Sequence, residues 1–386
     1  MKKIILFLNI LILLTTACTQ SPILLKGEIH DFEANQLYLY DVNDEFYNNV
    51  DLIDSIPVID GSFTYNIDSI ESKLYFIALQ NSKQENIQQG AYLFIEPTNM
   101  QISISSDKYN RMQVKGEGSK LEDKYLAFCE QKDAKGNRVL LDSLDALFYA
   151  AREKGDREEM KRIKELSSPY YDESREQKQQ FIKEAIEKEK GTLFGLYLYF
   201  SNQFQHSTFS TLEEINKVRN FISEFDSTAK SSSYYTRIEK GLQRFERCAV
   251  GNKAPDIAGF DTNNNPLSLS NFKGKYVLID FWSSGCGWCR KETPYLLEAF
   301  NKYKNNNFTI LGVSSDYHKN DWLKAIEEDK SFWDHLLIPK DSIRTIMNKY
   351  CIIGIPHILL INPEGKIIAK ELRGDNISKT IAEYIK

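Results

Sequence analysis

Hydrophobic and polar residues alternate in short runs from residue 23 to about residue 116. Turn-forming residues separate the runs, and Asp60-Gly61 lies between two of them. A period of two is typical of strands with one buried face, and an Asp-Gly pair between such strands is a hairpin signal. The pattern predicts an all-β domain over 23–116, a sandwich or small barrel, with strands at 24–29, 36–40, 55–59, 62–65, 74–79, 91–95 and 101–104.

The period changes after residue 116, where apolar residues recur at helical spacing among many Glu, Lys and Arg residues. Amphipathic segments rich in strong helix formers predict a helical middle region over 117–249. The segment 193–200 is apolar almost all round, which predicts a buried helix, because it is too short to span a bilayer. We expect helices at 120–131, 140–152, 156–166, 176–188, 193–200, 212–225 and 234–245.

Apolar strands alternate with helical segments over the last region, 250–386. This alternation predicts an α/β domain with helices on both faces of a sheet, so the whole chain is predicted to be multidomain. In such sheets the junctions between strands and helices are the usual place for a site. The expected strands are 276–280, 308–314, 357–361 and 366–369, and the expected helices are 295–300, 320–329, 343–350 and 377–385.

The first residues have the pattern of an export signal. A positive start is followed by an apolar run, 4–14, that is too short to cross a bilayer. Ala17-Cys18 then resembles the end of a bacterial lipoprotein signal, which predicts a signal peptide over 1–17, a lipid on Cys18 and a tether over 18–22. Thr15 stands where that pattern usually has Leu, so cleavage without a lipid is the alternative. By resemblance to lipoprotein sorting signals, Thr19 in place of Asp after Cys18 favours the outer over the inner membrane. We expect a lipid-anchored, periplasm-facing protein of the cell envelope.

Composition narrows the chemistry. The chain has 386 residues, of which 42% are hydrophobic and 27% are charged, as is ordinary for globular proteins. Its formal net charge of −5 gives no reason to expect a nucleic-acid partner. If Cys18 carries a lipid, five of the six cysteines remain. This odd number favours one functional pair plus scattered buried thiols over a dense disulfide scaffold.

The strongest chemical signal is the pair Cys286 and Cys289, which lies between the predicted strand 276–280 and a helix. Free N–H groups and the dipole at a helix start favour an anion, so the Cys286 thiol should ionise easily. Arg290 and Lys291 add positive charge nearby. A structural disulfide would close a very short loop and stabilise little, and half of a zinc site would need a matching second pair. We therefore predict a redox dithiol and no metal.

Three motifs together resemble the thioredoxin fold: Asp280-Phe281-Trp282, the Cys pair, and Gly354-Ile355-Pro356 before a strand. Within that fold, Ala254-Pro255-Asp256 and the segment 290–294 resemble the TlpA/ResA-type exported thiol-disulfide oxidoreductases. Region 23–116 resembles the β-rich domain of unknown function that often precedes such a domain in exported lipoproteins. This last likeness implies no chemistry.

The resemblance implies that Cys286 attacks a substrate disulfide as a thiolate and that Cys289 resolves the mixed disulfide. Pro356 should follow a cis peptide bond and lie against the pair. The redox-active group is then the Cys286–Cys289 disulfide itself, with no separate cofactor. Partners would be protein thiols or disulfides and a membrane or periplasmic electron donor. Substrate contacts are expected at Trp282, Trp288, Ile355 and Pro356.

Two acids complete the predicted site. A buried Asp280 would have a raised pKa and could exchange a proton with Cys289 near neutral pH. Glu292, one helical turn after Cys289, matches an acid linked to thiol titration in this family, with a solvated helix charge as the alternative. The sequence departs from the family at Gly285, where a Trp often stands, and at Trp288, which replaces a usual Pro. Both changes should alter the reduction potential.

The predicted function is reduction of protein disulfides. A ligand-binding or protein-binding lipoprotein with a secondary redox site, and a disulfide oxidase or isomerase, are the alternatives. A peroxidase would have Pro and Thr where Ile279 and Ser283 stand. The reduction potential separates the directions of electron flow, since about −270 mV is typical of a reductant and about −120 mV of an oxidant.

Overall fold

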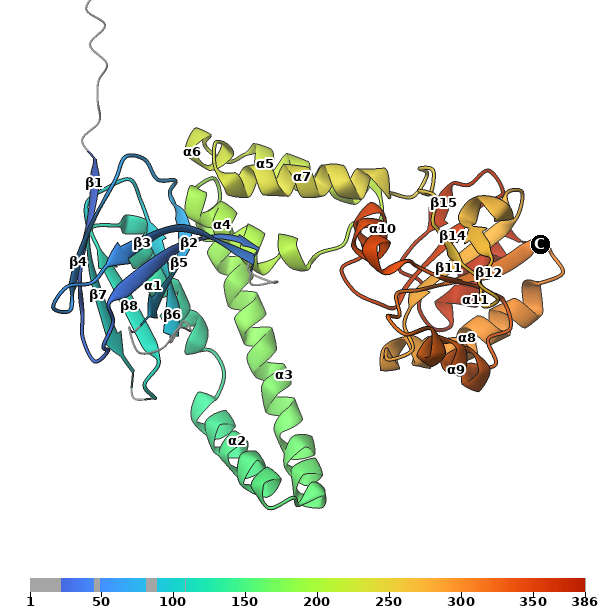
Figure 1. Ribbon diagram of the computed structural model, residues 1–386, viewed down its shortest axis with the longest axis horizontal. Helices are drawn as coiled ribbons and strands as arrows, with labels where there is room; N and C mark the ends of the chain where they lie inside the picture. Colours follow the sequence, from blue (N-terminus) through green and yellow to red (C-terminus); the bar gives the residue numbers. More distant parts are fainter. Residues whose placement is uncertain (1–21, 45–48, 81–88, 108, 386) are drawn as a thin grey trace, which may run out of the picture. The chain divides into compact units, whose positions relative to one another are not determined.

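The computed structural model describes residues 22–44, 49–80, 89–107 and 109–385 (Figure 1). The predicted signal peptide 1–17 and Cys18 lie outside these residues. The chain divides into two compact units, 1–184 and 185–386, so the predicted helical region 117–249 is shared between them. Over the described ranges, no helix is both long enough and apolar enough to cross a membrane.

In the first unit, the strands form two four-stranded sheets with the orders β4-β1-β7-β8 and β3-β2-β5-β6. The predicted all-β domain is confirmed, and the two separate sheets make it a sandwich. The last strand, β8, had no predicted counterpart. The bounds are β1 Ile23–Ile29, β2 Gln36–Asp44, β3 Asn49–Pro57, β4 Ser62–Ile67, β5 Lys73–Gln80, β6 Gln89–Ile95, β7 Met100–Ser106 and β8 Met112–Glu117.

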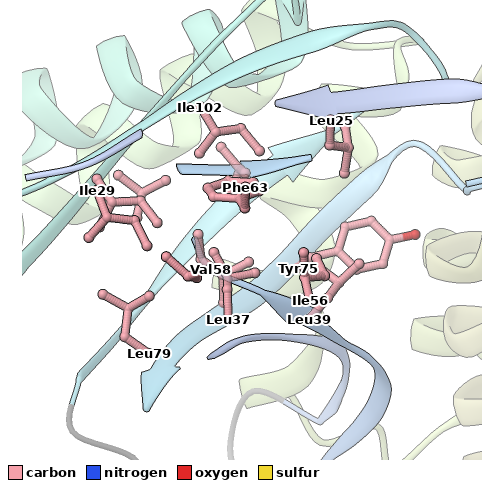
Figure 2. Close-up of a cluster of buried hydrophobic side chains, with 14 of the residues drawn as sticks. Leu25, Ile29, Leu37, Leu39, Ile56, Val58, Phe63, Tyr75, Leu79 and Ile102 are labelled. Atoms are coloured by element: carbon pink, nitrogen blue, oxygen red, sulfur yellow. The ribbon is translucent and has the colours of Figure 1, made fainter. Parts of the chain in front are cut away.

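Inward-facing residues of both sheets fill the space between them (Figure 2). Leu25, Phe63 and Ile102 come from the first sheet, whereas Leu37 and Leu79 come from the second. All are buried, as expected for side chains on the inward face of a sheet. This sandwich core carries the fold of the first unit.

Helix α1 (Lys120–Asp133) begins directly after the sandwich, with Ser119 as its N-cap. Its Glu122 side chain is fully buried and accepts a hydrogen bond of 2.7 Å from the Phe94 backbone N–H. Burial raises the pKa of Glu122 to about 7, against the lowering effect of that hydrogen bond. The contact ties α1 to the sandwich through a carboxyl group that is costly to ionise.

The prediction of two helices at 156–166 and 176–188 is wrong, because α3 runs unbroken from Arg157 to Lys188 with Pro169 inside it. A proline removes a backbone donor from the helix. Two hydrogen bonds to the preceding helix α2 (Arg138–Glu153) and the loop before it stabilise this stretch. The Tyr171 hydroxyl donates to the Asp145 carboxylate, and the Gln177 side-chain oxygen accepts a 2.9 Å hydrogen bond from the Gly136 N–H. Tertiary packing therefore overrides the helix-breaking signal.

The second unit begins with helices that lead into the α/β domain. Leu193–Phe200 is buried throughout, which confirms the predicted buried helix. The helix α7 ends at Arg247, with Cys248 as its C-cap. The bounds are α4 Leu193–Asn202, α5 Leu212–Ser223, α6 Ser227–Lys230 and α7 Ser233–Arg247.

The α/β domain has a seven-stranded mixed sheet with the order β10-β9-β13-β12-β11-β14-β15. Strands β13, β12 and β11 are parallel, and β14 runs antiparallel to β11. The short strand β13 had no predicted counterpart. The strand bounds are β9 Ala258–Phe260, β10 Pro266–Ser268, β11 Tyr276–Trp282, β12 Phe308–Ser314, β13 Asp334–Leu337, β14 His357–Ile361 and β15 Ile367–Ala369.

Hydrophobic clusters cover both faces of this sheet, which confirms the predicted α/β domain. On one face, Ile279 and Phe281 of β11 pack with Ile346 of α10. On the other, Leu278 packs with Leu296 of α8 and with α11. The helix bounds are α8 Gly287–Tyr303, α9 Lys319–Asp329, α10 Ile343–Lys349 and α11 Asn376–Tyr384. The central strand β11 is thus fixed from both sides, and its end positions the cysteine pair.

Candidate active site

The two predicted cysteines lie at the start of α8, just after the end of β11. Cys286 is the N-cap of α8 and is half-buried, whereas Cys289, in its first turn, is 3% exposed. The two sulfurs form a disulfide. Of the two cysteines, only Cys286 is partly exposed to solvent.

Backbone groups surround the Cys286 sulfur. The Cys289 N–H points at Cys286 Sγ over 3.1 Å, and the Ile355 carbonyl oxygen lies 3.8 Å from it. A free N–H at a helix start stabilises a thiolate and lowers its pKa. The structure thus places a backbone N–H donor beside the Cys286 sulfur.

Of the two basic residues expected beside the pair, Arg290 is paired with acids. Arg290 contacts Asp329 and Glu328 of α9, with N–O distances of 2.5 Å and 3.1 Å. Lys291 Nζ lies 4.1 Å from the ring centroid of Trp288. The Arg290 guanidinium thus joins α8 to α9, and the backbone supplies the closest polarity to Cys286.

A second loop approaches the pair from the end of α10. The Ile355–Pro356 peptide bond is cis, as the motif predicts. Pro356 is buried and Ile355 is half-buried. Trp288, by contrast, is 72% exposed beside Cys286. Cys286 is thus flanked by the cis-proline loop and by the exposed Trp288.

Trp282 lies behind the pair. Its side chain is 5% exposed and belongs to a cluster with Cys289 and with Trp322 and Ala325 of α9. This position makes Trp282 a wall of the site that shields Cys289 from solvent. Of the two tryptophans predicted to contact substrate, only Trp288 is exposed to solvent.

The predicted acids occupy the α8 side of the sheet. Asp280 is 6% exposed, and within the described residues its Oδ1 has no hydrogen-bond partner. Burial raises the pKa of Asp280 to about 7; the Arg373 charge opposes this and the Glu292 charge adds to it. Glu292 Oε2 accepts a 2.7 Å hydrogen bond from the Gly374 N–H, so this acid is not a freely solvated helix charge.

Sequence reasoning missed Asp316. Its carboxylate accepts hydrogen bonds from the Ser284 N–H at 2.9 Å, from the Ser284 hydroxyl at 2.6 Å and from the Ser314 hydroxyl at 2.7 Å. It therefore fixes the loop that precedes Cys286. A signal existed, because Asp316 lies just two positions after the end of β12, and the ends of adjacent parallel strands meet at one edge of the sheet.

Arg373 was also missed. Its guanidinium donates to the Pro356 carbonyl oxygen and to the Leu372 carbonyl oxygen, the latter over 2.7 Å. It also lies 3.8 Å from Glu371, whose other oxygen is 3.0 Å from His357 Nδ1. Arg373 thus holds the loop of the cis-proline, and its own positive charge is the one that opposes the raised pKa of Asp280. No local pattern marks it, since it follows an irregular segment after β15.

The sequence predicts that the remaining cysteines are scattered buried thiols, but two of the three that the structure describes lie together. Cys129 is half-buried in α1. Cys248 and Cys351 are both buried, and their sulfurs lie 3.2 Å apart. This second pair is separated by 103 positions, which hides it from spacing arguments.

A mixed sheet covered by helices, with a Cys-x-x-Cys pair at a helix start and a cis-proline beside it, defines a thioredoxin-like domain. Residues 250–370 match the AhpC/TSA family, and residues 24–125 match a domain of unknown function, DUF4369.

Curated relatives identify the family more closely. The thiol-disulfide oxidoreductase ResA of Bacillus thuringiensis subsp. konkukian is 30% identical over 153 residues, which are 39% of this chain and 86% of the relative. ResA of Bacillus subtilis is 30% identical over 140 residues, which are 36% of this chain and 76% of the relative. The solved thioredoxin domain of a thiol-disulfide oxidoreductase from Bacteroides vulgatus is 55% identical, covers 36% of this chain and 99% of its own, and has a TM-score of 0.35. The chain belongs to the family of the ResA thiol-disulfide oxidoreductases.

Proposed function

We propose that this protein reduces disulfide bonds of other proteins, with Cys286 as the attacking and Cys289 as the resolving cysteine. The observation that carries the proposal is the asymmetry of the pair. Cys286 is accessible at the start of α8 and faces the Cys289 N–H, whereas Cys289 is buried one turn deeper. Family membership supports thiol–disulfide exchange as the chemistry.

The reaction proceeds in two exchanges. The Cys286 thiolate attacks one sulfur of a substrate disulfide, which forms a mixed disulfide and releases the other sulfur as a thiolate. The Cys289 thiol then loses its proton and attacks Cys286 Sγ, which releases the second substrate thiolate. Two electrons pass to the substrate, and the Cys286–Cys289 disulfide remains. A dithiol donor of the membrane or the periplasm would restore the reduced pair.

Reduction of insulin by the reduced protein tests this function. We expect Cys286→Ser to lower the rate of insulin reduction to the uncatalysed background, because serine cannot form the mixed disulfide. Cys129→Ser serves as the matched control and should keep the full rate. Unchanged insulin reduction by Cys286→Ser would contradict the proposal and favour a binding protein with a secondary redox site.

We also propose that the protein faces the periplasm on a lipid anchor at Cys18, in the outer rather than the inner membrane. The signal-like segment 1–17 and the position of Cys18 support this. Cells fed a radiolabelled fatty acid should label the wild-type protein, and Cys18→Ala should remove the label. Label retained by Cys18→Ala, or absent from the wild type, would contradict the anchor.

A further inference from the structure

Two buried thiols outside the active site meet at the junction between α7 and the α/β domain. Cys248 ends α7 and is 0% exposed, and Cys351 follows α10 and is 2% exposed. Their sulfurs are 3.2 Å apart. The two cysteines thus bring together chain segments separated by 103 positions.

Each sulfur also lies against the element that carries the other cysteine. Cys248 Sγ is 2.5 Å from the Lys349 carbonyl oxygen at the end of α10, and Cys351 Sγ is 3.1 Å from the Arg244 carbonyl oxygen in α7. Cys351 has a φ of 58°, in the left-handed region that residues other than glycine seldom adopt. Such a backbone persists only where surrounding contacts hold it. The pair is therefore held in a defined reciprocal arrangement.

We propose that Cys248 and Cys351 form a second disulfide, which fastens the end of α7 to the segment that leads into the cis-proline loop. Cys351 is five positions before Pro356. The bond would thus anchor the base of the loop that borders Cys286. Because both sulfurs are buried, it is a structural bond and takes no part in substrate turnover.

The oxidant is a low-molecular-weight disulfide, which reaches the thiols before packing is complete or during local opening. The Cys248 thiolate attacks this disulfide and releases one small thiol. Cys351 then attacks Cys248 Sγ and releases the second. Two cysteine thiols are oxidised, one disulfide is reduced to two thiols, and the two protons leave with them. The hydrogen bond from Cys351 lowers the pKa of the Cys248 thiol, which favours Cys248 as the attacking sulfur.

Peptide mapping of the full chain tests the bond directly. The purified protein is incubated with oxidised glutathione, unfolded with iodoacetamide present and digested without reduction. We expect one linked peptide pair that contains Cys248 and Cys351, lighter than the two free peptides by two hydrogen atoms. Oxidation of Cys286–Cys289 in the same sample is the internal control. Alkylated Cys248 and Cys351 in a sample with that pair oxidised, or a link to Cys129, would overturn the proposal.

Thermal unfolding provides a second measurement. In a Cys286→Ser/Cys289→Ser background, reduction should lower the Tm of the second unit by about 5–15 °C, because a long loop is no longer closed. The same background with Cys248→Ala and Cys351→Ala should show no response to reduction. An equal Tm before and after reduction in the first background would count against the bond. Both samples lack the catalytic pair, so their outcome is independent of the proposed function.

Discussion

Replacing Cys289 with serine is expected to trap substrates on Cys286 as stable mixed disulfides. In the proposed mechanism Cys289 completes the exchange by attacking Cys286 Sγ, and a serine hydroxyl cannot do this. Turnover of insulin should fall to background while about one covalent adduct accumulates per chain. Non-reducing electrophoresis and mass spectrometry after incubation with a disulfide-containing peptide measure the adduct, and dithiothreitol should release it.

The matched variant Cys286→Ser separates the two roles. It retains Cys289, which is 3% exposed behind Trp282, so it should form no adduct under the same conditions. Cys129→Ser combined with Cys289→Ser should trap substrate as well as Cys289→Ser alone. Adducts on Cys289 in place of Cys286 would reverse the assignment of attacking and resolving sulfurs.

The parts of this site that the sequence predicted are those encoded over short distances. Local periodicity places the Cys pair between a strand end and a helix start. The Gly354-Ile355-Pro356 segment is a contiguous motif that is identified by its resemblance to the thioredoxin fold. Asp280 lies at the end of the predicted strand, and its role as an acid follows from the resemblance to the TlpA/ResA-type oxidoreductases. The fold class follows equally from periodicity, first of two and then of 3.6 residues.

The parts that were missed depend on tertiary structure. Asp316 reaches the loop before Cys286 only because β12 pairs in parallel with β11, in a register that aligns Ser314 with Trp282. Arg373 lies beyond β15 and donates to the Pro356 carbonyl oxygen, 17 positions earlier in the chain. Strand β13 has only four residues, too few to show a period. Cys248 and Cys351 are in contact although 103 positions separate them in the chain.

Asp280→Asn is expected to slow the second exchange, the release of reduced substrate from Cys286. Asp280 has a pKa of about 7 and interacts electrostatically with Glu292, which lies one helical turn from Cys289. We propose that its carboxylate takes the Cys289 proton near neutral pH, which asparagine cannot do. A lost general base costs roughly 10²-fold at the low end of the usual range. Single-turnover release of reduced peptide, followed from pH 5 to pH 10, measures the effect.

The pH profile identifies the mechanism. Below pH 6 the wild-type Asp280 is itself protonated, so the wild type and Asp280→Asn should converge. They should converge again above about pH 9, where an ordinary thiol ionises without a base. The ratio of the two rates should therefore peak between pH 7 and pH 8. A ratio that stays constant over the whole range would mean that Asp280 only maintains the local structure.

The stability of Asp280→Asn at different pH values serves as the control. The direction of the Asp280 pKa shift fixes the sign of the expected change in the free energy of unfolding. Burial raises the pKa of Asp280 from 3.8 to about 7, so the folded state disfavours the carboxylate. This penalty is absent below about pH 4 and complete above pH 7, where Asp280→Asn should be more stable than the wild type by up to about 4 kcal/mol. Glu122→Gln removes a similar buried acid from the first unit. It should also be more stable than the wild type at pH 8 yet leave substrate release unchanged, which separates proton transfer at Cys289 from the general benefit of removing a buried charge.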